Sequence, residues 1–183
     1  MKIANRIIDK NSPAFIIAEL SANHNGSIEI AKQTIKAAKK AGADCVKFQT
    51  YTPETITLDH KSDHFMIAHD TIWDGKYLYD LYKEAFTPWE WHKELFEVCS
   101  KEGLIFLSSP FDFTAVDFLE SLDVPAYKIA SFEITDIPLI EYTASKMKPI
   151  IISTGIANLE DIELAVNVCR NVGNNEIALL KCT

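Results

Sequence analysis

CVKFQT, at residues 45–50, is a short and largely apolar run that ends in polar residues. A run of this kind predicts a strand buried on both faces, which is typical of a parallel sheet. Five more runs along the chain share the pattern: FIIAEL (15–20), IFLSSP (105–110), AYKIAS (126–131), PIIISTG (149–155) and IALLKCT (177–183). The sequence therefore predicts six parallel strands.

Helical patterns separate the predicted strands, as in SIEIAKQTIKAAKKAGA (27–43), where apolar residues recur near helical spacing. The sequence TPWE (87–90) predicts a helix start, with Thr87 as the cap and Glu90 completing a capping box. Asn158 begins a further helical pattern. The chain is thus a repeated βα unit, for which right-handed crossovers are expected.

Two architectures fit this order, a (β/α)8 barrel and an open doubly wound sheet. No G-x-G-x-x-G follows the first strand, which disfavours the dinucleotide-binding form of the open sheet. Polar residues end nearly every run, and this favours a barrel because all barrel strands lead to one central site. An open sheet would gather them at its switch point. We therefore predict an α/β TIM barrel, with residues 1–13 as a small hairpin closing its bottom.

Composition narrows the class of protein. The net charge of −8 disfavours a nucleic-acid partner, which requires a basic face. The four cysteines lack CxxC spacing, so reduced, buried thiols in a cytoplasmic protein are expected. No signal peptide is evident, and no apolar run approaches the ~20 residues that cross a bilayer, so no membrane association is expected.

Lysines inside buried strands are the main chemical signal. Lys47 and Gln49 alternate with apolar residues and share one face of their strand. A buried lysine needs a partner or a task, and an ion pair with Glu19 is the simpler explanation. Lys128 and Lys181 repeat the pattern on two other strands. Three such lysines favour a cradle for phosphate and carboxylate groups.

Small hydroxyl residues at strand ends complete this candidate anion site. They are Ser109, Ser131, Ser153 and Thr154. A serine nucleophile is disfavoured because no G-x-S-x-G elbow is present. Glu19 and Glu133, near two strand ends, could act as acid or base, with lysine pairing as the alternative. The histidines show no metal-binding spacing, so no metal ligand is predicted among them: His24, His60, His64, His69 and His92.

Residues 51–86 form one long interruption between the second strand and its helix. A segment of this length inside a compact domain is usually a lid or a binding loop. It is rich in Tyr, His, Asp and Trp, and YLYDLYKEA (77–85) predicts a short helix within it.

Six blocks of this sequence together resemble the sialic acid synthase family, and they span nearly the whole chain. They read IIAELSANHNGS, GADCVKFQTYTPETIT, IFLSSPFD, VPAYKIASFEITDIPLI, KPIIISTGIA and ALLKCT. Two stretches are similar to the pseudaminic acid synthase branch: residues 71–96, and KIASFEITD (128–136) in place of the glycine-containing K-I-G-S-G-E of N-acetylneuraminate synthases.

The resemblance implies a phosphoenolpyruvate-binding TIM barrel that condenses this substrate with an N-acetylated amino sugar. In the branch it resembles, 2,4-diacetamido-2,4,6-trideoxy-altrose gives pseudaminic acid and phosphate. Glu19 and Glu133 would face the sugar and the reacting centre. Matching positions would hold the phosphate and carboxylate of phosphoenolpyruvate: Lys47, Gln49, Ser109, Lys128, Ser131, Ser153 and Thr154. Lys181 stands at a position where some members of the family have a histidine.

The resemblance further implies a divalent metal, with manganese expected, whose histidine ligands are not in this chain. Two more barrel strands and an antifreeze-like C-terminal domain of a homodimer would follow. Residues 1–183 are therefore expected to be the N-terminal portion of a barrel truncated after about the sixth strand, inactive alone and prone to self-association. The alternatives are an N-acetylneuraminate or legionaminic acid synthase, a Schiff-base aldolase using Lys47 or Lys128, and a non-catalytic anion-binding barrel fragment.

Overall fold

The computed structural model describes residues 1–68 and 70–182. Its main sheet has six parallel strands, each paired with its neighbours in chain order. These strands are β3 (Ile17–Glu19), β4 (Cys45–Thr50), β5 (Ile105–Pro110), β6 (Tyr127–Ile129), β7 (Ile150–Ser153) and β8 (Ile177–Leu180). The order contains no reversal and therefore no switch point. The prediction of a barrel-type sheet is confirmed, and the open doubly wound alternative is wrong.

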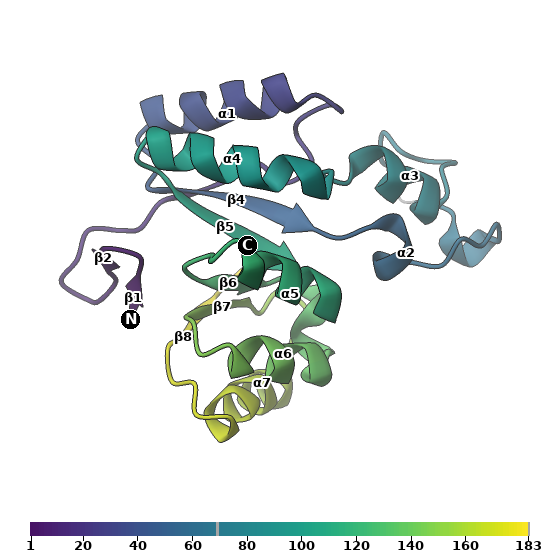
Figure 1. Ribbon diagram of the computed structural model, residues 1–183. Helices are drawn as coiled ribbons and strands as arrows, with labels where there is room; N and C mark the ends of the chain where they lie inside the picture. The colour runs from purple at the N-terminus through teal and green to yellow at the C-terminus, as the bar shows by residue number, and fades with distance from the viewer. Residues whose placement is uncertain (69, 183) are drawn as a thin grey trace.

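Helices cover the outer face of the curled sheet. Figure 1 shows α1 and α4 on the side of β4 and β5, and α5, α6 and α7 on the side of the last three strands. The helices are α1 (Ile28–Lys40), α2 (Pro53–Ile56), α3 (Leu78–Ala85), α4 (Trp89–Lys101), α5 (Phe113–Ser121), α6 (Ile137–Ser145) and α7 (Leu159–Asn171). Two 3₁₀ turns, η1 (Asp63–Phe65) and η2 (Phe132–Thr135), lie in loops. None of the described helices is long and apolar enough to cross a bilayer.

Alternation along the strands divides the apolar core into two parts. One set of strand residues packs under the helices, including Val46, Phe48 and Phe106. The other set lies on the inner face and forms a separate apolar cluster with Ile3: Cys45, Leu107, Ala126 and Ile151. Their cluster includes Ile3 of the N-terminal segment, so they form an apolar floor at the end of the sheet where that segment lies.

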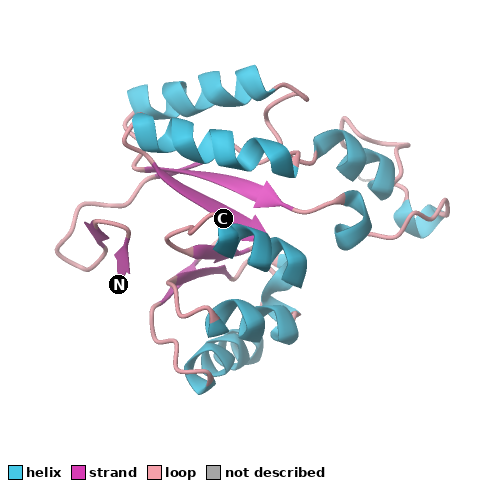
Figure 2. Ribbon diagram, viewed as in Figure 1, coloured by secondary structure: helices cyan, strands magenta, loops and turns pink. Residues whose placement is uncertain are grey.

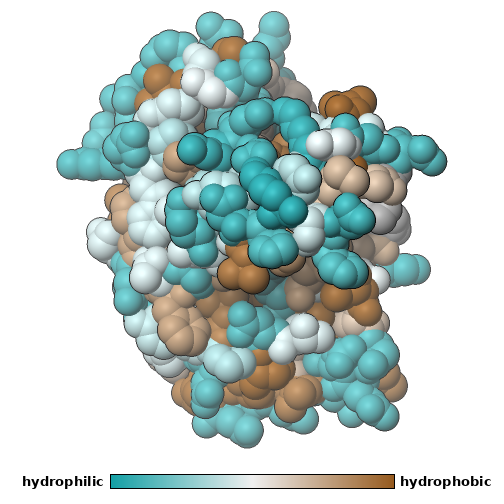
Figure 3. All heavy atoms as spheres, turned by 90° about the vertical axis from the view of Figure 1, so that its right-hand side faces the viewer, coloured by the Kyte–Doolittle hydropathy of each residue, from teal (hydrophilic) through white to brown (hydrophobic). Residues whose placement is uncertain are grey.

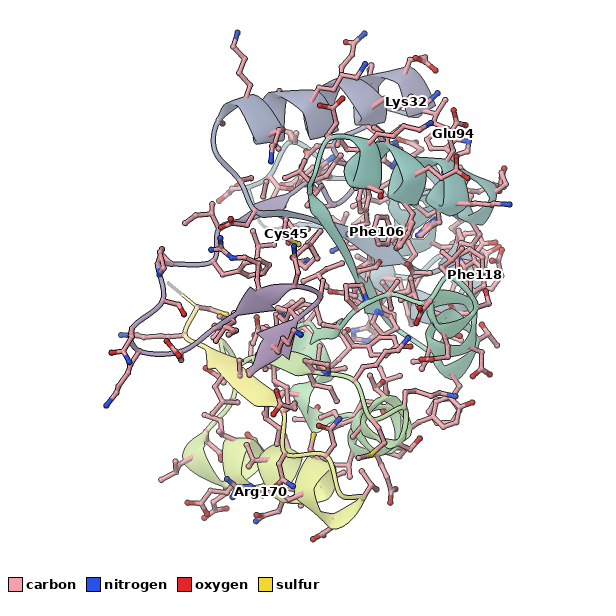
Figure 4. The ribbon with its side chains drawn as sticks, turned by 60° about the vertical axis from the view of Figure 1, so that its left-hand side comes forward. Lys32, Cys45, Glu94, Phe106, Phe118 and Arg170 are labelled. Atoms are coloured by element: carbon pink, nitrogen blue, oxygen red, sulfur yellow. The ribbon has the colours of Figure 1, made fainter. Side chains whose placement is uncertain are left out.

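The N-terminal hairpin closes this floor, as the sequence predicted. Strands β1 (Lys2–Ile3) and β2 (Arg6–Ile7) pair antiparallel. Figures 1 and 2 place the hairpin at the end of the sheet opposite the arrowheads. Ile3 is fully buried, and Figure 4 shows the side chain of Cys45 on the hairpin side of its strand. The interior is therefore sealed at the bottom and open at the strand C-terminal ends.

The predicted helix start at residue 87 is wrong in detail. Pro88, not Thr87, is the cap of α4, and the buried Thr87 hydroxyl has no hydrogen-bond partner. The Pro88 carbonyl accepts the Trp91 N–H (3.0 Å), so the backbone alone closes the first turn.

Figure 4 shows Lys32 of α1 and Glu94 of α4 facing each other, and their ion pair measures 2.5 Å.

The predicted cap of α7 is confirmed. The Asn158 side chain accepts the Asp161 N–H (3.0 Å), and Asp161 in turn accepts the Asn158 N–H (3.0 Å). This reciprocal pair satisfies donors that a helix start would otherwise leave free. The short helix predicted within residues 51–86 is also present, as α3.

Candidate functional site

The strand C-terminal ends surround a pocket of about 330 Å³. Its lining joins residues from five strands and the loop after β6: Ile17, Glu19, Lys47, Gln49, Lys128, Ala130, Ser131, Ser153 and Leu180. A cavity of about 370 Å³ at the other end of the sheet, beside Gly103 and Pro125, is lined by no cation. The first pocket contains Lys47 and Lys128, two of the lysines that the sequence analysis selected, and we call it the anion pocket.

Strand register brings the two lysines of this pocket to the inner face. Glu19 lies opposite Lys47 in the β3–β4 pair, and their side chains form an ion pair. The simpler explanation that the sequence offered for Lys47 is thus correct in this structure. The Lys47 side chain is nearly buried, whereas that of Glu19 is half-exposed. The pair can therefore open toward a ligand on the Glu19 side.

Lys128 is the uncompensated charge of the anion pocket. It is 5% exposed, and its ammonium donates to the Ser153 hydroxyl (2.6 Å) and the Ile129 carbonyl (2.5 Å). No described carboxylate lies within ion-pair distance of it. Burial, followed by the nearby charge of Lys47, lowers the Lys128 pKa to about 8. A buried cation without a counter-ion is costly, and an anionic ligand would restore the balance.

The candidate hydroxyls differ in their access to a ligand. Ser109 is fully buried opposite Gln49 and does not line the anion pocket, although its hydroxyl has no partner among the described residues. The Ser131 hydroxyl accepts the Ile156 N–H (3.2 Å) and keeps its own proton to donate. The Thr154 hydroxyl instead donates to the Leu180 carbonyl (3.1 Å). Of the four hydroxyl residues predicted from the sequence, Ser131 and Ser153 line the pocket, whereas Ser109 and Thr154 do not.

The surroundings of Cys182 favour negative charge at this corner of the pocket. The hydroxyl of Ser153 lowers the pKa of the exposed Cys182 thiol, and the Ser131 hydroxyl and two backbone N–H groups add to the effect. Donors that stabilise a thiolate can equally stabilise a phosphate oxygen. Gly155 packs closely against this corner. A Cβ at this position would lie only 2.6 Å from the Ser131 hydroxyl oxygen, so any larger residue would force a shift there.

Two sequence predictions about this end of the chain need correction. Lys181 is exposed and does not line the anion pocket, so the cradle contains two lysines rather than three. The thiol of Cys182 is exposed rather than buried, whereas Cys45, Cys99 and Cys169 are buried and free as expected. Leu180, one residue before Lys181, occupies the inner face instead.

A second pocket of about 400 Å³ adjoins the first, and we call it the aromatic pocket. It shares Gln49 and Ala130 with the anion pocket and contains Glu133. Burial raises the pKa of Glu133, and one of its carboxyl oxygens is buried without a partner. A raised pKa favours the protonated form of this carboxyl group, which is the form that can donate a proton to a ligand.

Sequence reasoning missed the rest of the aromatic pocket: Ile56, Tyr82, Phe111 and Phe132. Two of these residues come from the long 51–86 segment, whose many tyrosines were the available signal. Figure 3 looks at the face toward which the strands point, and apolar side chains lie there among hydrophilic ones. The long segment therefore helps to build the site, as a binding loop would.

Metal binding finds no support among residues 1–68 and 70–182. No three His, Cys, Asp or Glu side chains there lie close enough together to hold an ion, so no catalytic step is assigned to a metal. His24 is buried, and its ring accepts the Gly26 N–H (3.1 Å). His69 lies outside the described residues.

A curled parallel half-barrel with an anion pocket at its strand C-terminal ends defines a TIM-barrel-type protein. Residues 34–183 match the NeuB family, and the chain belongs to that family. It is 53% identical to a pseudaminic acid synthase of Helicobacter pylori over 93% of this chain and 50% of that protein. It is 36% identical to an N,N'-diacetyllegionaminic acid synthase of Legionella pneumophila over 92% of this chain and 48% of that protein.

Solved structures agree with the fold. An N-acetylneuraminic acid synthetase of Leptospira borgpetersenii, in complex with citrate, matches with a TM-score of 0.87 and 30% identity. That match covers 100% of this chain and 59% of the other. The chain spans about half the length of the curated relatives it matches.

Proposed function

We propose that this chain is part of a pseudaminic acid synthase that joins phosphoenolpyruvate to 2,4-diacetamido-2,4,6-trideoxy-altrose. The observation that carries the proposal is Lys128, a buried cation without a carboxylate partner, in a pocket with a second lysine and the hydroxyls of two serines. Greater identity to a pseudaminic acid synthase than to a legionaminic acid synthase supports this branch. A divalent metal, a homodimer, a cytoplasmic location and the lack of a nucleic-acid partner remain predictions.

The anion pocket suits phosphoenolpyruvate because that molecule carries a phosphate and a carboxylate close together. Lys128 and Ser153 would bind one group, with Ser131 beside them. Lys47 and Gln49 would bind the other, whereas Ser109 does not line the pocket. Thr154 would not contact the ligand directly, because its hydroxyl and its backbone N–H both donate to the Leu180 carbonyl. These donors would also stabilise charge on the departing phosphate.

The aromatic pocket would hold the open-chain sugar beside this cradle. C3 of phosphoenolpyruvate attacks the sugar aldehyde carbon, and the aldehyde oxygen takes a proton from Glu133. Water then adds to C2, and the C2–O bond to phosphate breaks so that phosphate leaves with its bridging oxygen. Glu19, paired with Lys47, can accept a proton from that water.

Two measurements on the full-length protein test the proposal. Calorimetry should show phosphoenolpyruvate binding that Lys128→Met strongly weakens and Lys181→Met, an exposed control, leaves unchanged. Phosphate release should require both phosphoenolpyruvate and the sugar, with the altrose derivative preferred. A preference for N-acetylmannosamine or for the legionaminic acid precursor would instead assign one of the sister activities. Binding without turnover of any sugar would favour the non-catalytic anion-binding alternative.

One observation favours a second candidate, a Schiff-base aldolase. A lysine with a pKa near 8 is partly uncharged at neutral pH and can attack a carbonyl. Borohydride added during turnover would then trap a covalent adduct at Lys128 or Lys47. The synthase proposal requires that no adduct form, and mass spectrometry of the treated protein decides between the two.

A further inference from the structure

The aromatic pocket is unusual in its chemistry for a site that binds a sugar. Apart from Gln49 and Glu133, its lining is apolar or aromatic. A polyhydroxylated sugar placed there would lose hydrogen bonds to water and find few replacements. Acetamido methyls and a C6 methyl would instead gain apolar contact. The lining therefore fits a deoxygenated, N-acetylated sugar better than an ordinary hexosamine.

Part of this aromatic lining is held rigidly from behind. Tyr51 is 2% exposed and lies edge-on to both Tyr82 and Phe111, with ring centroids 5.6 Å apart in each pair. Tyr82 lines the same pocket as Glu133, and its pKa is raised by burial, with the charge of Glu133 adding to the effect. The contact surface is therefore formed before any ligand arrives.

Phe132 adds a third aromatic ring to the lining of this pocket. It begins the η2 turn, directly before Glu133, and is 74% exposed although it lines the pocket. Exposure of this extent gives the ring little role in the fold. An exposed aromatic ring next to the candidate acid is placed to contact a ligand.

We propose that Phe132, Tyr82 and Phe111 form a specificity wall that selects 6-deoxy, N-acetylated amino sugars over sugars that keep the 6-hydroxyl. The inference rests on the proposed function and deepens it by naming what the sugar pocket recognises. An apolar pocket rejects a ligand that merely adds a hydroxyl by at most about a hundredfold. The wall is therefore expected to give a ten- to hundredfold preference in kcat/KM.

The test compares Phe132→Ala with Phe113→Ala in the full-length protein. Phe113 is also partly exposed, but it lies on α5 against Tyr142 and lines neither pocket. With the altrose derivative and N-acetylmannosamine as substrates, F132A should reduce the preference at least fivefold while the KM for phosphoenolpyruvate stays within twofold. F113A should change neither quantity. An unchanged preference in a folded F132A would overturn the inference.

Saturation-transfer NMR separates this inference from the proposed function because it needs no turnover. In wild-type protein loaded with phosphoenolpyruvate, the C6 and acetamido methyls of the altrose derivative should receive the strongest saturation. F132A should weaken the C6 signal and F113A should not. Methyl saturation without turnover would refute the synthase and keep the wall, whereas turnover without methyl saturation would do the reverse.

Discussion

At the scale of single residues, Lys128 links the energetics of the fold to the proposed chemistry. Its pKa of about 8 means that burial disfavours the charged form that binds an anion. An anionic ligand reverses this, since a nearby negative charge favours the ammonium. Binding should therefore be coupled to proton uptake at Lys128.

The first prediction is the pH dependence of phosphoenolpyruvate binding. Below about pH 8 Lys128 is already protonated, so affinity should be flat from pH 7 to 8. Above it, binding must first add a proton, and affinity should fall about tenfold per pH unit. Calorimetry from pH 7 to 9.5 measures this fall. Lys128→Met should bind weakly with no such slope, and a slope that persists in K128M would assign it to another group.

The second prediction concerns Glu133, whose raised pKa and unpartnered oxygen mark it as a proton donor. Glu133→Gln keeps the shape but cannot transfer a proton. Turnover of the full-length protein should fall at least about a hundredfold, as expected for loss of general acid catalysis. Affinity for phosphoenolpyruvate should stay within twofold. Glu141→Gln, an exposed control on α6, should match wild type, and near-normal turnover in E133Q would remove Glu133 from the mechanism.

At the scale of elements, a buried polar chain fastens α4 to the strands that carry the site. The His92 ring nitrogen Nε2 is hydrogen-bonded to the Thr50 hydroxyl (2.9 Å), and that hydroxyl is hydrogen-bonded to the Ser108 hydroxyl (2.7 Å). The other ring nitrogen lies 3.2 Å from the Pro88 carbonyl. Thr50 directly follows Gln49, and Ser108 directly precedes Ser109; both Gln49 and Ser109 are on the inner face. This hydrogen-bonded chain of side chains therefore fixes the ends of β4 and β5 on their helix-facing side.

The third prediction is that this contact weakens in acid. Burial lowers the His92 pKa to about 4, from 6.5 in an unfolded chain. The folded state excludes the proton, so its stability is full above pH 6.5 and declines as pH falls toward 4. The difference corresponds to about 3 kcal/mol. Urea unfolding at pH 7 and pH 4.5 should show a smaller loss for His92→Gln than for wild type. Equal losses would show that the ring does not titrate this way.

At the scale of the whole molecule, the sequence predicts the sheet well and the pocket only in part. Lys47 and Gln49 were placed correctly because polar residues mark the inner face of their strand. IALLKCT is apolar throughout its first four positions, so its sequence does not set which alternate residues face inward. Register with β7 turns Leu180 inward, and Lys181 falls outside the pocket. The Thr154 hydroxyl likewise donates a hydrogen bond to the Leu180 carbonyl, a contact that exists only because β7 and β8 pair.

The aromatic pocket was not predictable for a different reason. Tyr82 and Phe132 lie far apart in the chain and converge only because the 51–86 segment folds back over the strand ends. Figure 1 shows this segment beyond the C-terminal ends of β4 and β5. Hydrophobic periodicity predicts helices and strands, but it does not predict the path of a long loop. Such residues need the tertiary structure before they can be named.

The fourth prediction concerns the open sheet edges of the polypeptide 1–183 produced alone. β3 and β8 each lack a partner on one side in the described sheet, and Leu179 (46% exposed) and Ile16 (51% exposed) lie at or beside them. Unpaired strand edges with apolar side chains promote pairing between molecules. Light scattering should therefore give a dimer or larger species at high concentration. Leu179→Lys adds an edge charge and should shift the population toward monomer. A wild-type polypeptide that stays monomeric under these conditions would show that the edges are already protected, and the expectation of self-association would fail.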